Sequence, residues 1–439
     1  MDQEISTPEL LHLLDHPDVK IIDVRSPEAY NGWKLQGEPR GGHIRNARNL
    51  PAKWTGYMDW IETVRQKGIF PEYEIIVYGY GAEEAQNVAD YFIRAGYPKV
   101  KIYSGFLNEW VKNDDLPMEH MERYRHLVPA GWVNTLLSGG SPAHYNNKDY
   151  RIIHAHYRNR DAYLSGHIPG AIDMDTLALE APETWNRRSP GELGEALEQH
   201  GITSDTTVIL YGKYMFPDNK DPFPGSAAGD IGALRLAFIM MYAGVKDVRV
   251  LNGGFRAWTD AGFQVSYRDE QKVPVEQFGA TIPLNPELAV DTPGAKEMIN
   301  SQDKELVCVR SYAEYIGETS GYNYIEPKGR IPGAVFADCG SDAYHMENYR
   351  NVDLTTREYN EIAEIWKQNG ITPDKHLAFY CGTGWRGSEA WFNAWLMGWP
   401  RVSVYDGGWF EWSSDPRNPY ETGIPAQQPA PGTNQSDVE

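Results

Sequence analysis

The chain has 439 residues, of which 41% are apolar, so it is long enough to build about three domains with hydrophobic cores of their own. Its 41 basic and 61 acidic side chains give a formal net charge of −20, which argues against nucleic acids and anionic membranes as partners. The three cysteines, Cys308, Cys339 and Cys381, are too few for a disulfide framework and suit a reducing compartment.

The first residues carry neither the basic segment nor the apolar core of a secretory signal peptide, and no apolar run approaches the length of a membrane span. We therefore expect a cytoplasmic protein, or a periplasmic one if an export signal has been removed. The sequence leaves the oligomeric state open.

One pattern of helix, strand and turn is repeated three times along the chain. In each copy a glycine expected to cap a helix is followed nine residues later by a turn glycine, and five residues after that by a tryptophan. The three sets are Gly96, Gly105 and Trp110; Gly244, Gly253 and Trp258; and Gly398, Gly407 and Trp412. Such fixed spacing indicates three copies of one structural unit.

Each copy also contains two apolar segments that read as buried strands. The first strands are expected at residues 20–25, 151–156 and 306–310, and the second at residues 75–78, 207–211 and 377–380. Strands of this kind alternating with helices predict α/β domains, each with a small, mainly parallel sheet covered by helices on both faces. We place the domains at residues 1–124, 125–279 and 280–423, and expect the Pro- and Gln-rich tail at 424–439 to be disordered.

A cysteine and two glycines follow the second strand of the third copy. Cys381 is expected at the carboxyl end of that strand, and Gly382 and Gly384 allow the loop to direct several backbone N–H groups at one centre. Residues 388–397 read as a helix, whose N-terminus adds positive potential, and Arg386 adds a full charge. These features should stabilise a thiolate at Cys381 and hold an anion attached to its sulfur. The alternative is a buried structural cysteine in an ordinary turn.

The first two copies lack this nucleophile. Gly79 and Gly212 stand at the position of Cys381, so we predict that the first two domains shape a cleft or dock a partner. The second copy carries 15 extra residues at this loop, including 215–225. This insertion either reaches the neighbouring active site or forms a solvated surface loop.

No metal or other cofactor is predicted. His154 and His156 share one face of a strand in the second copy and would be suitable ligands. No third ligand stands at a persuasive spacing, so we interpret both histidines as satisfied polar residues.

Taken together and in order, these motifs resemble those of rhodanese domains, which are sulfurtransferase modules. The resemblance rests on Asp-Val-Arg-Ser at 23–26, Gly-His-Ile-Pro-Gly-Ala at 166–171, the cysteine loop after a strand, and the late glycine pair with a tryptophan. It covers most of the chain as three tandem domains. The pattern is similar to the bacterial three-domain type, in which the last domain alone carries a catalytic cysteine.

The resemblance implies a double displacement that starts from a Cys381 thiolate. The thiolate would attack the outer sulfur of thiosulfate, release sulfite and retain a persulfide. Cyanide or a thiol, including a thiol on a protein acceptor, would then remove the sulfur.

The residues assigned to the loop and the substrate are Gly382, Thr383, Gly384, Trp385, Arg386 and Arg310. Backbone N–H groups of the loop would stabilise the persulfide, Thr383 could donate a hydroxyl hydrogen bond, and Trp385 would exclude water or simply belong to the core. Arg386 and Arg310 would bind the sulfonate of the donor, although Arg310 could equally join strand to loop. Cys308 is interpreted as a core residue and Cys339 as a structural one.

Three other functions compete with this hypothesis. Protein phosphatases of the Cys-x5-Arg type have one more residue in the loop than Cys381 to Arg386, and this tighter loop suits a single sulfur better than a phosphate. Mercaptopyruvate sulfurtransferases resemble the loop as far as Gly384 but continue Val-Thr, where this chain has Trp385 and Arg386. A sulfur carrier or docking protein with little turnover of small donors is the third alternative, because two of the domains lack a nucleophile.

Overall fold

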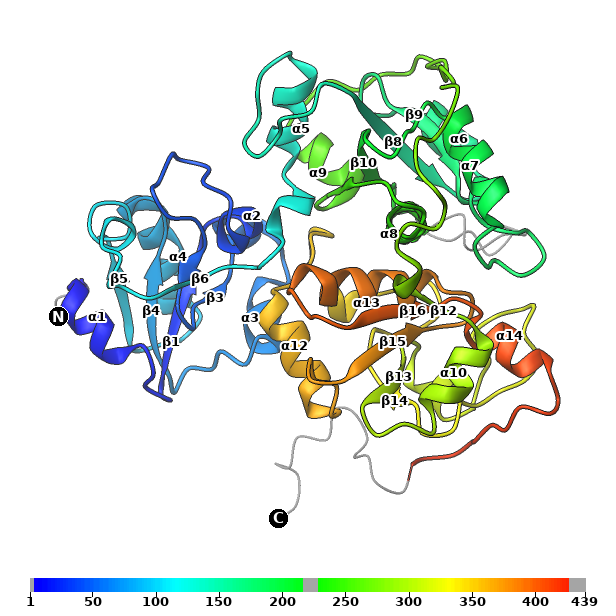
Figure 1. Cartoon of the computed structure of the whole chain (residues 1–439). Coiled ribbons are helices and arrows are strands. Elements are labelled where there is room, and N and C mark those ends of the chain that lie inside the picture. The colour runs from blue at the N-terminus through cyan, green and yellow to red at the C-terminus, as the bar shows by residue number, and fades with distance from the viewer. Residues whose placement is uncertain (1–3, 216–227, 426–439) are drawn as a thin grey trace. The chain divides into compact units, whose positions relative to one another are not determined.

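The computed structural model describes residues 4–215 and 228–425, which divide between two compact units, Met1–Arg125 and His126–Glu439 (Figure 1). The predicted α/β architecture is confirmed, because the three main sheets are parallel throughout. No helix in the described ranges is long and apolar enough to cross a membrane. The predicted disordered tail from 426 onward and residues 216–227 of the predicted insertion lie outside the described residues. The exact domain boundaries stay predictions.

The first unit contains a four-stranded parallel sheet in the order β3-β1-β4-β5 and a short antiparallel pair, β2 with β6. The strands are β1 (Val19–Asp23), β2 (His43–Ile44), β3 (Arg48–Asn49), β4 (Glu74–Tyr78), β5 (Val100–Tyr103) and β6 (Met118–Glu119). The helices are α1 (Thr7–Leu13), α2 (Pro27–Asn31), α3 (Trp60–Gln66) and α4 (Ala82–Arg94). The buried ion pair of Asp23 and Arg25 follows β1, and no thiol is present in this unit.

The second unit contains two five-stranded parallel sheets. The sheet of what we call the second domain has the order β7-β11-β10-β8-β9. Its elements are β7 (Leu127–Val128), α5 (Ala130–Leu137), β8 (Tyr150–His156), α6 (Arg160–Leu164), β9 (Ile172–Asp175), α7 (Pro190–Gln199), β10 (Thr207–Tyr211), α8 (Gly229–Ala243), β11 (Asp247–Leu251) and α9 (Gly254–Asp260).

The sheet of what we call the third domain has the corresponding order, β12-β16-β15-β13-β14. Its elements are β12 (Ala289–Val290), α10 (Thr292–Met298), β13 (Lys304–Cys308), α11 (Tyr312–Tyr315), β14 (Val335–Phe336), α12 (Tyr359–Gln368), β15 (His376–Tyr380), α13 (Trp385–Leu396), β16 (Val402–Tyr405) and α14 (Gly408–Ser414). Strand β15 lies in the middle of the sheet and is buried from Leu377 onward, as a central parallel strand requires.

The three capping glycines predicted from their spacing adopt the same conformation. Gly96, Gly244 and Gly398 have φ angles of +91°, +117° and +84°, a region that side-chain-bearing residues rarely adopt. In each case the next residue donates its N–H to a carbonyl five positions earlier, which ends the helix in a Schellman-type turn. The repeat in the sequence is therefore a repeat in backbone geometry.

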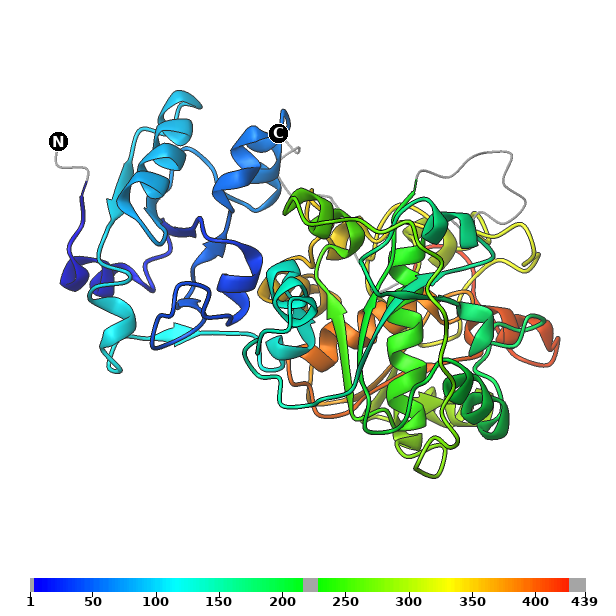
Figure 2. The ribbon, with the colours of Figure 1, turned by 90° about the horizontal axis from the view of Figure 1, so that it is seen from above.

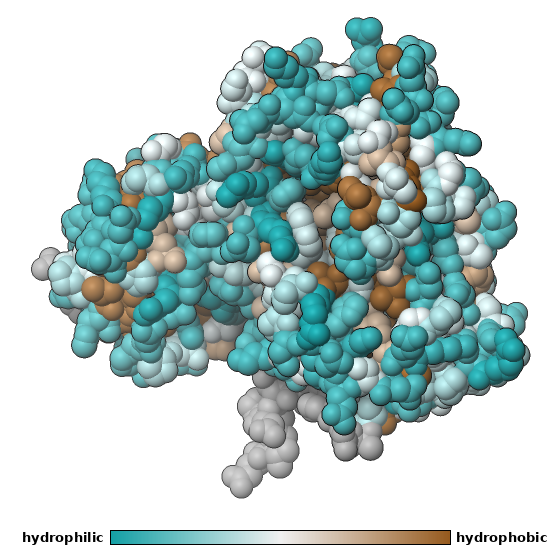
Figure 3. Space-filling model, viewed as in Figure 1, coloured by the Kyte–Doolittle hydropathy of each residue, from teal (hydrophilic) through white to brown (hydrophobic). Residues whose placement is uncertain are grey.

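The second and third domains pack through their longest helices, α8 and α13. Helix α8, the long green helix at the centre of the second unit in Figure 2, is buried along almost its whole length. This explains why its sequence is apolar on all sides, since one side faces its own sheet and another faces α13. Phe238 of α8 meets Trp391 of α13 edge to face, with ring centroids 5.3 Å apart. The outer face in Figure 3 is mostly hydrophilic, with hydrophobic residues in small patches.

We expect Phe238→Ala to destabilise the second unit by roughly 3–5 kcal/mol, because it removes a fully buried ring from the contact between the two helices. Urea denaturation would measure this as a lower free energy of unfolding. The matched control is Tyr267→Ala, since Tyr267 is 70% exposed and should change stability by no more than about 0.5 kcal/mol. Equal effects of the two variants would contradict the packing described here.

Candidate active site at the Cys381 loop

The loop predicted to carry the nucleophile lies where β15 ends and α13 begins. Backbone N–H groups of Trp409 and Phe410 donate to the carbonyls of Cys381 and Gly382 at 2.8 and 2.9 Å. Gly384 has φ +88° and turns the chain into α13. The loop carbonyls are thus bound to α14, whereas the first N–H groups of α13 have no partner inside the helix. The anion nest that the sequence predicts beside the cysteine stays a prediction, and the start of α13 lies where that prediction needs it.

Tyr322 covers this loop, and sequence reasoning missed it. Its hydroxyl oxygen accepts the Gly382 N–H at 3.3 Å and the Arg386 Nη2 at 2.6 Å. A Cβ at position 382 would lie 2.3 Å from the Tyr322 ring, so only glycine allows this close approach. Burial raises the pKa of Tyr322 well above its ordinary value, so the hydroxyl keeps its proton. With two donors already on its oxygen, the hydroxyl can donate its own proton to a third partner.

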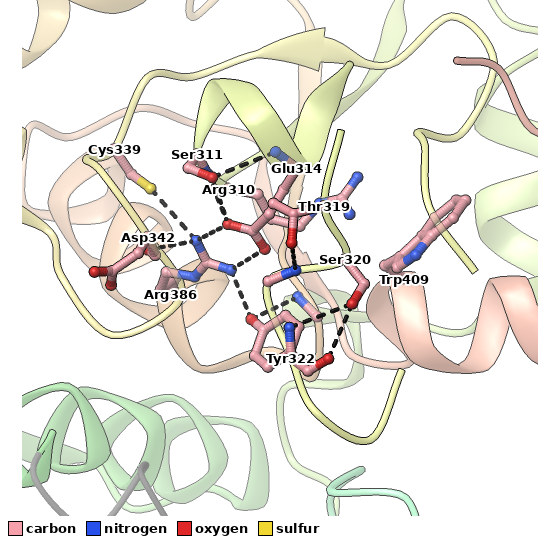
Figure 4. Close-up of polar contacts among 12 residues, drawn as sticks. Arg310, Ser311, Glu314, Thr319, Ser320, Tyr322, Cys339, Asp342, Arg386 and Trp409 are labelled. Carbon is pink, nitrogen blue, oxygen red and sulfur yellow. Dashed lines mark hydrogen bonds and ion pairs between the residues drawn. The ribbon is translucent and has the colours of Figure 1, made fainter. Parts of the chain in front are cut away.

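Arg386 has a carboxylate partner that the sequence analysis did not identify. Glu314 accepts two hydrogen bonds from its guanidinium at 2.8 and 2.9 Å, and the Asp342 carbonyl accepts a third at 3.0 Å (Figure 4). The Cys339 sulfur lies 3.9 Å from the same guanidinium. The charge expected to bind a donor sulfonate is therefore already balanced by Glu314, and Arg386 braces Tyr322 over the loop.

Arg310 lies behind the loop rather than in front of it. It is fully buried, and its Nε and Nη2 donate to the Cys308 sulfur at 3.2 Å and to the Gly329 carbonyl at 2.7 Å. Its guanidinium also lies 5.0 Å from the ring centroid of Trp409. Arg310 does not line the cavity described next, so its position corresponds to the structural alternative, with a thiol and a carbonyl as partners.

Burial raises the pKa of the Cys339 thiol above its ordinary value, which disfavours a thiolate there.

A cavity of about 360 Å³ opens above the loop between the second and third domains. Thr383 and Arg386 of the loop region line it, together with six aromatic side chains: Tyr157, Trp185, Tyr322, Tyr324, Tyr344 and Trp385. Trp185 and Tyr324 stack directly on each other in its wall, with ring centroids 4.5 Å apart. The second domain therefore supplies part of the wall, which is the cleft-shaping role predicted for a domain without a nucleophile.

Two residues that the second domain contributes to this cavity have strained backbones. Arg158 and Trp185 have φ angles of +53° and +56°, although neither is glycine. Such conformations persist only where surrounding contacts enforce them, and they concentrate at functional sites. The sequence gives no sign of this strain, because it arises from contacts made after folding.

The second domain cannot carry a side chain at the position that corresponds to Cys381. A Cβ on Gly212 would lie 1.9 Å from the carbonyl oxygen of Gly229. Of the predicted insertion, residues 216–225 lie outside the described residues, so its reach stays a prediction. Tyr214, just before it, does contact the third domain, with its hydroxyl 2.8 Å from His345 Nε2.

The two histidines of the second domain face different surroundings. Burial lowers the pKa of His154 to about 3, and its ring lies 4.9 Å from that of Tyr211. His156 lies 3.2 Å from a carboxylate oxygen of Asp173. In the described part of the chain, no group of three or more His, Cys, Asp or Glu side chains is arranged to hold a metal ion.

Comparison with known proteins agrees with this fold and site. The family model described as "Rhodanese-like domain" matches residues 6–113, 143–261 and 292–415, which together make up most of the chain. The thiosulfate sulfurtransferase YnjE of Escherichia coli is 40% identical over 96% of this chain and 93% of its own length. Thiosulfate sulfurtransferase of Bos taurus is 28% identical over 70% of this chain and 97% of its own. The chain therefore belongs to the rhodanese family, as its motifs predict, and is a sulfurtransferase with tandem domains.

Solved structures of EanB are more similar still. Wild-type EanB is 66% identical and superposes with a TM-score of 0.96, covering 97% of this chain and 99% of its own. EanB has been solved in complex with hercynine, in complex with ergothioneine, and as a cysteine persulfide in a tetrahedral intermediate state with ergothioneine.

We expect Glu314→Gln to destabilise the protein by roughly 3–5 kcal/mol, because it leaves the Arg386 charge buried without its partner. Although burial alone would raise it, Arg386 holds the pKa of Glu314 below its ordinary value of 4.5. The difference in unfolding free energy between wild type and variant should be complete above pH 4.5 and shrink as the pH falls below it.

Chemical denaturation at several pH values would measure this difference. The control is Glu318→Gln, which changes an exposed carboxylate on the same segment and should be nearly neutral. A difference that grows in acid would contradict the ion pair.

Proposed function

We propose that this protein transfers sulfane sulfur from a persulfide on Cys381 to the imidazole ring of hercynine, forming ergothioneine. The observation that carries the proposal is the cavity of six aromatic rings and two arginines, Arg158 and Arg386, that opens above the Cys381 loop. Hercynine, the trimethylammonium betaine of histidine, carries a quaternary cation, a carboxylate and an imidazole. Each of these groups has a chemical counterpart in the cavity or the loop.

The aromatic walls suit a quaternary ammonium group. Such a cation cannot donate hydrogen bonds, and proteins bind it through the faces of several aromatic rings. Trp185, Tyr324 and Tyr157 supply such rings, and burial raises the pKa of Tyr324 far above neutrality, so that its ring stays uncharged. Arg158 is the cation placed to receive the carboxylate.

The positions altered in the EanB structures support Cys381 as the nucleophile. In EanB the persulfide cysteine lies 59 residues after a tyrosine that has been changed to Phe and Ala, and two residues before a threonine that has been changed to Ala and Val. In this chain the same intervals separate Cys381 from Tyr322 and Thr383. Two further cysteines altered in EanB fall at the intervals of Cys308 and Cys339.

The chemistry needs no external oxidant or reductant. The outer sulfur of the persulfide anion bonds to the imidazole carbon between the two nitrogens, while Tyr322 donates its proton to a ring nitrogen. That carbon then loses its hydrogen as a proton to the Tyr322 phenolate, and the S–S bond breaks with its electron pair passing to the Cys381 sulfur. The carbon is oxidised, the transferred sulfur is reduced, and the products are a ring thione and the Cys381 thiolate.

The hydrogen bonds around Tyr322 fit this exchange. The Gly382 N–H and the Arg386 guanidinium both donate to its oxygen and would stabilise the phenolate while it exists. The anion nest of the loop would hold first the persulfide and then the departing thiolate. The EanB variant with phenylalanine at the matching tyrosine was solved as a persulfide in a tetrahedral intermediate state with ergothioneine.

A second candidate is the transfer of sulfur from thiosulfate to cyanide or a thiol. The similarity to YnjE over 96% of the chain favours it. The pairing of Arg386 with Glu314 does not, since that guanidinium is no longer available to a sulfonate. Mercaptopyruvate as the donor, and a carrier role with a protein acceptor, are further outcomes that the following experiment distinguishes.

The test begins with protein loaded with sulfur, desalted and checked by intact mass for one added sulfur atom. Thiosulfate, mercaptopyruvate and polysulfide are compared as donors. Mixing the persulfide with hercynine should yield one ergothioneine per loaded site, detected by mass spectrometry, and Cys381→Ser should neither load nor react. A persulfide that is consumed by cyanide but not by hercynine would overturn the proposal in favour of the second candidate.

We expect Tyr322→Phe to slow sulfur transfer to hercynine roughly 100-fold, because the variant keeps the ring but loses the proton donor. Single-turnover measurements on persulfide-loaded protein would report this rate, and loading itself should be unchanged. The control Tyr420→Phe removes a hydroxyl from a residue that is 59% exposed and should have no effect. Equal slowing of loading and transfer would assign Tyr322 to maintenance of the loop instead.

A further inference from the structure

A fully buried carboxylate of the second domain binds the cysteine loop of the third. Both oxygens of Glu180 accept hydrogen bonds from the indole Nε1 of Trp385, at 2.9 and 3.1 Å. One of them also accepts a hydrogen bond from Arg235 Nε at 2.6 Å, and the side chains of Glu180 and Arg235 are both 0% exposed. Because burying an ion pair costs desolvation, an apolar pair would serve packing alone equally well. Packing alone therefore does not explain the buried pair of Glu180 and Arg235.

Arg235 extends this contact to both sides of the cavity. Its Nη2 donates to the carbonyl of Trp185 at 2.8 Å and also lies 2.6 Å from Asp406 Oδ1. Its Nη1 lies so close to Gly384 that a Cβ there would be 2.8 Å away. A single guanidinium thus touches the turn that follows Cys381 and holds the strained backbone of the cavity wall.

The groups that face Glu180 are Arg235, Asp406, the Thr176 hydroxyl and the Trp385 indole. Burial raises the pKa of Glu180 to about 7, even though Arg235 opposes the shift. The carboxyl therefore takes up a proton more readily than an ordinary glutamate as the pH is lowered. A glutamine has the shape of the neutral form, which makes Glu180→Gln an informative substitution.

We infer that Glu180 is a positioning residue for sulfur transfer, which fixes Trp385 directly and Trp185 and Gly384 through Arg235. The inference rests on the proposed transfer to an acceptor in this cavity. Loading of sulfur onto Cys381 requires the loop alone, whereas transfer requires the acceptor to be held between walls from two domains. Loss of the Glu180 charge should therefore affect the second step more than the first.

The experiment is a double-mutant cycle of Glu180→Gln and Trp385→Phe on persulfide-loaded protein at about pH 8. Trp385→Phe removes the indole N–H and leaves the pair of Glu180 and Arg235 in place. We expect Glu180→Gln to lower the single-turnover rate with hercynine about tenfold and to raise the hercynine concentration that gives half of the maximal rate. In the Trp385→Phe background the same change should have a clearly smaller effect.

The control is Asp230→Asn, which alters another carboxylate of the second domain, with a side chain that is 10% exposed and paired with Arg350 of the third domain. Loading, followed by intact mass, should be unchanged in Asp230→Asn and should change less than transfer in Glu180→Gln. The tenfold gap between wild type and Glu180→Gln should also narrow as the pH is lowered toward 6, because the wild-type carboxyl becomes neutral.

Equal effects of Glu180→Gln in both backgrounds, or an equal effect of Asp230→Asn, would overturn the inference and leave Glu180 a packing residue. If Glu180→Gln does not fold, Glu180→Asp takes its place in the cycle. If wild-type persulfide fails to convert hercynine, the proposed function fails separately. The cycle is then run with cyanide, and the inference stands only if the coupling appears there.

Discussion

The site depends on one close approach, in which the ring of Tyr322 lies against the backbone of Gly382. A side chain at 382 would collide with the ring, and in this position the Tyr322 hydroxyl accepts hydrogen bonds from both the Gly382 N–H and Arg386. Arg386 in turn is fixed by the carboxylate of Glu314 at the start of α11. The cysteine loop, the tyrosine that covers it and the buried ion pair of Arg386 and Glu314 are therefore joined by direct contacts.

The second domain has no nucleophile at the position of Cys381, and it forms part of the cavity wall instead. The carbonyl of Gly229 leaves no room for a side chain at Gly212, just after β10, so that the second domain acts through other residues. These are rings and a carboxylate that follow β8 and β9, held in place by the packing of α8 on α13. The third domain carries the cysteine loop, and the second supplies part of the cavity wall beside it.

The features that the sequence predicts well are local or periodic. The spacing of Gly96, Gly244 and Gly398 specifies three helix ends, and all three have positive φ. The position of Cys381 after an apolar strand and before two glycines is enough to locate the loop. Each of these signals depends on neighbouring residues only, so no knowledge of the tertiary fold is needed.

The residues that the sequence did not reveal act over long separations. Tyr322 lies 59 residues before Cys381, and Glu180 lies 205 residues before the tryptophan that it binds. The sequence does give some information about Glu314, because Ser311 and Glu314 form a capping box. That pattern predicts the start of a helix and does not identify Glu314 as the partner of Arg386. Arg310 was placed near the substrate by analogy with its position after a strand, whereas its side chain turns toward Cys308 and Gly329.

The closed turn at Gly212 has a consequence for how such a protein diversifies. A repeat without a thiol does not carry reactive sulfur. Its exposed rings and charges can therefore be substituted without changing the nucleophile. The cysteine that accepts sulfur and the residues that would select its recipient then lie in different repeats of the same chain. A new recipient can be acquired by substitutions in the second repeat while the cysteine turn of the third stays as it is.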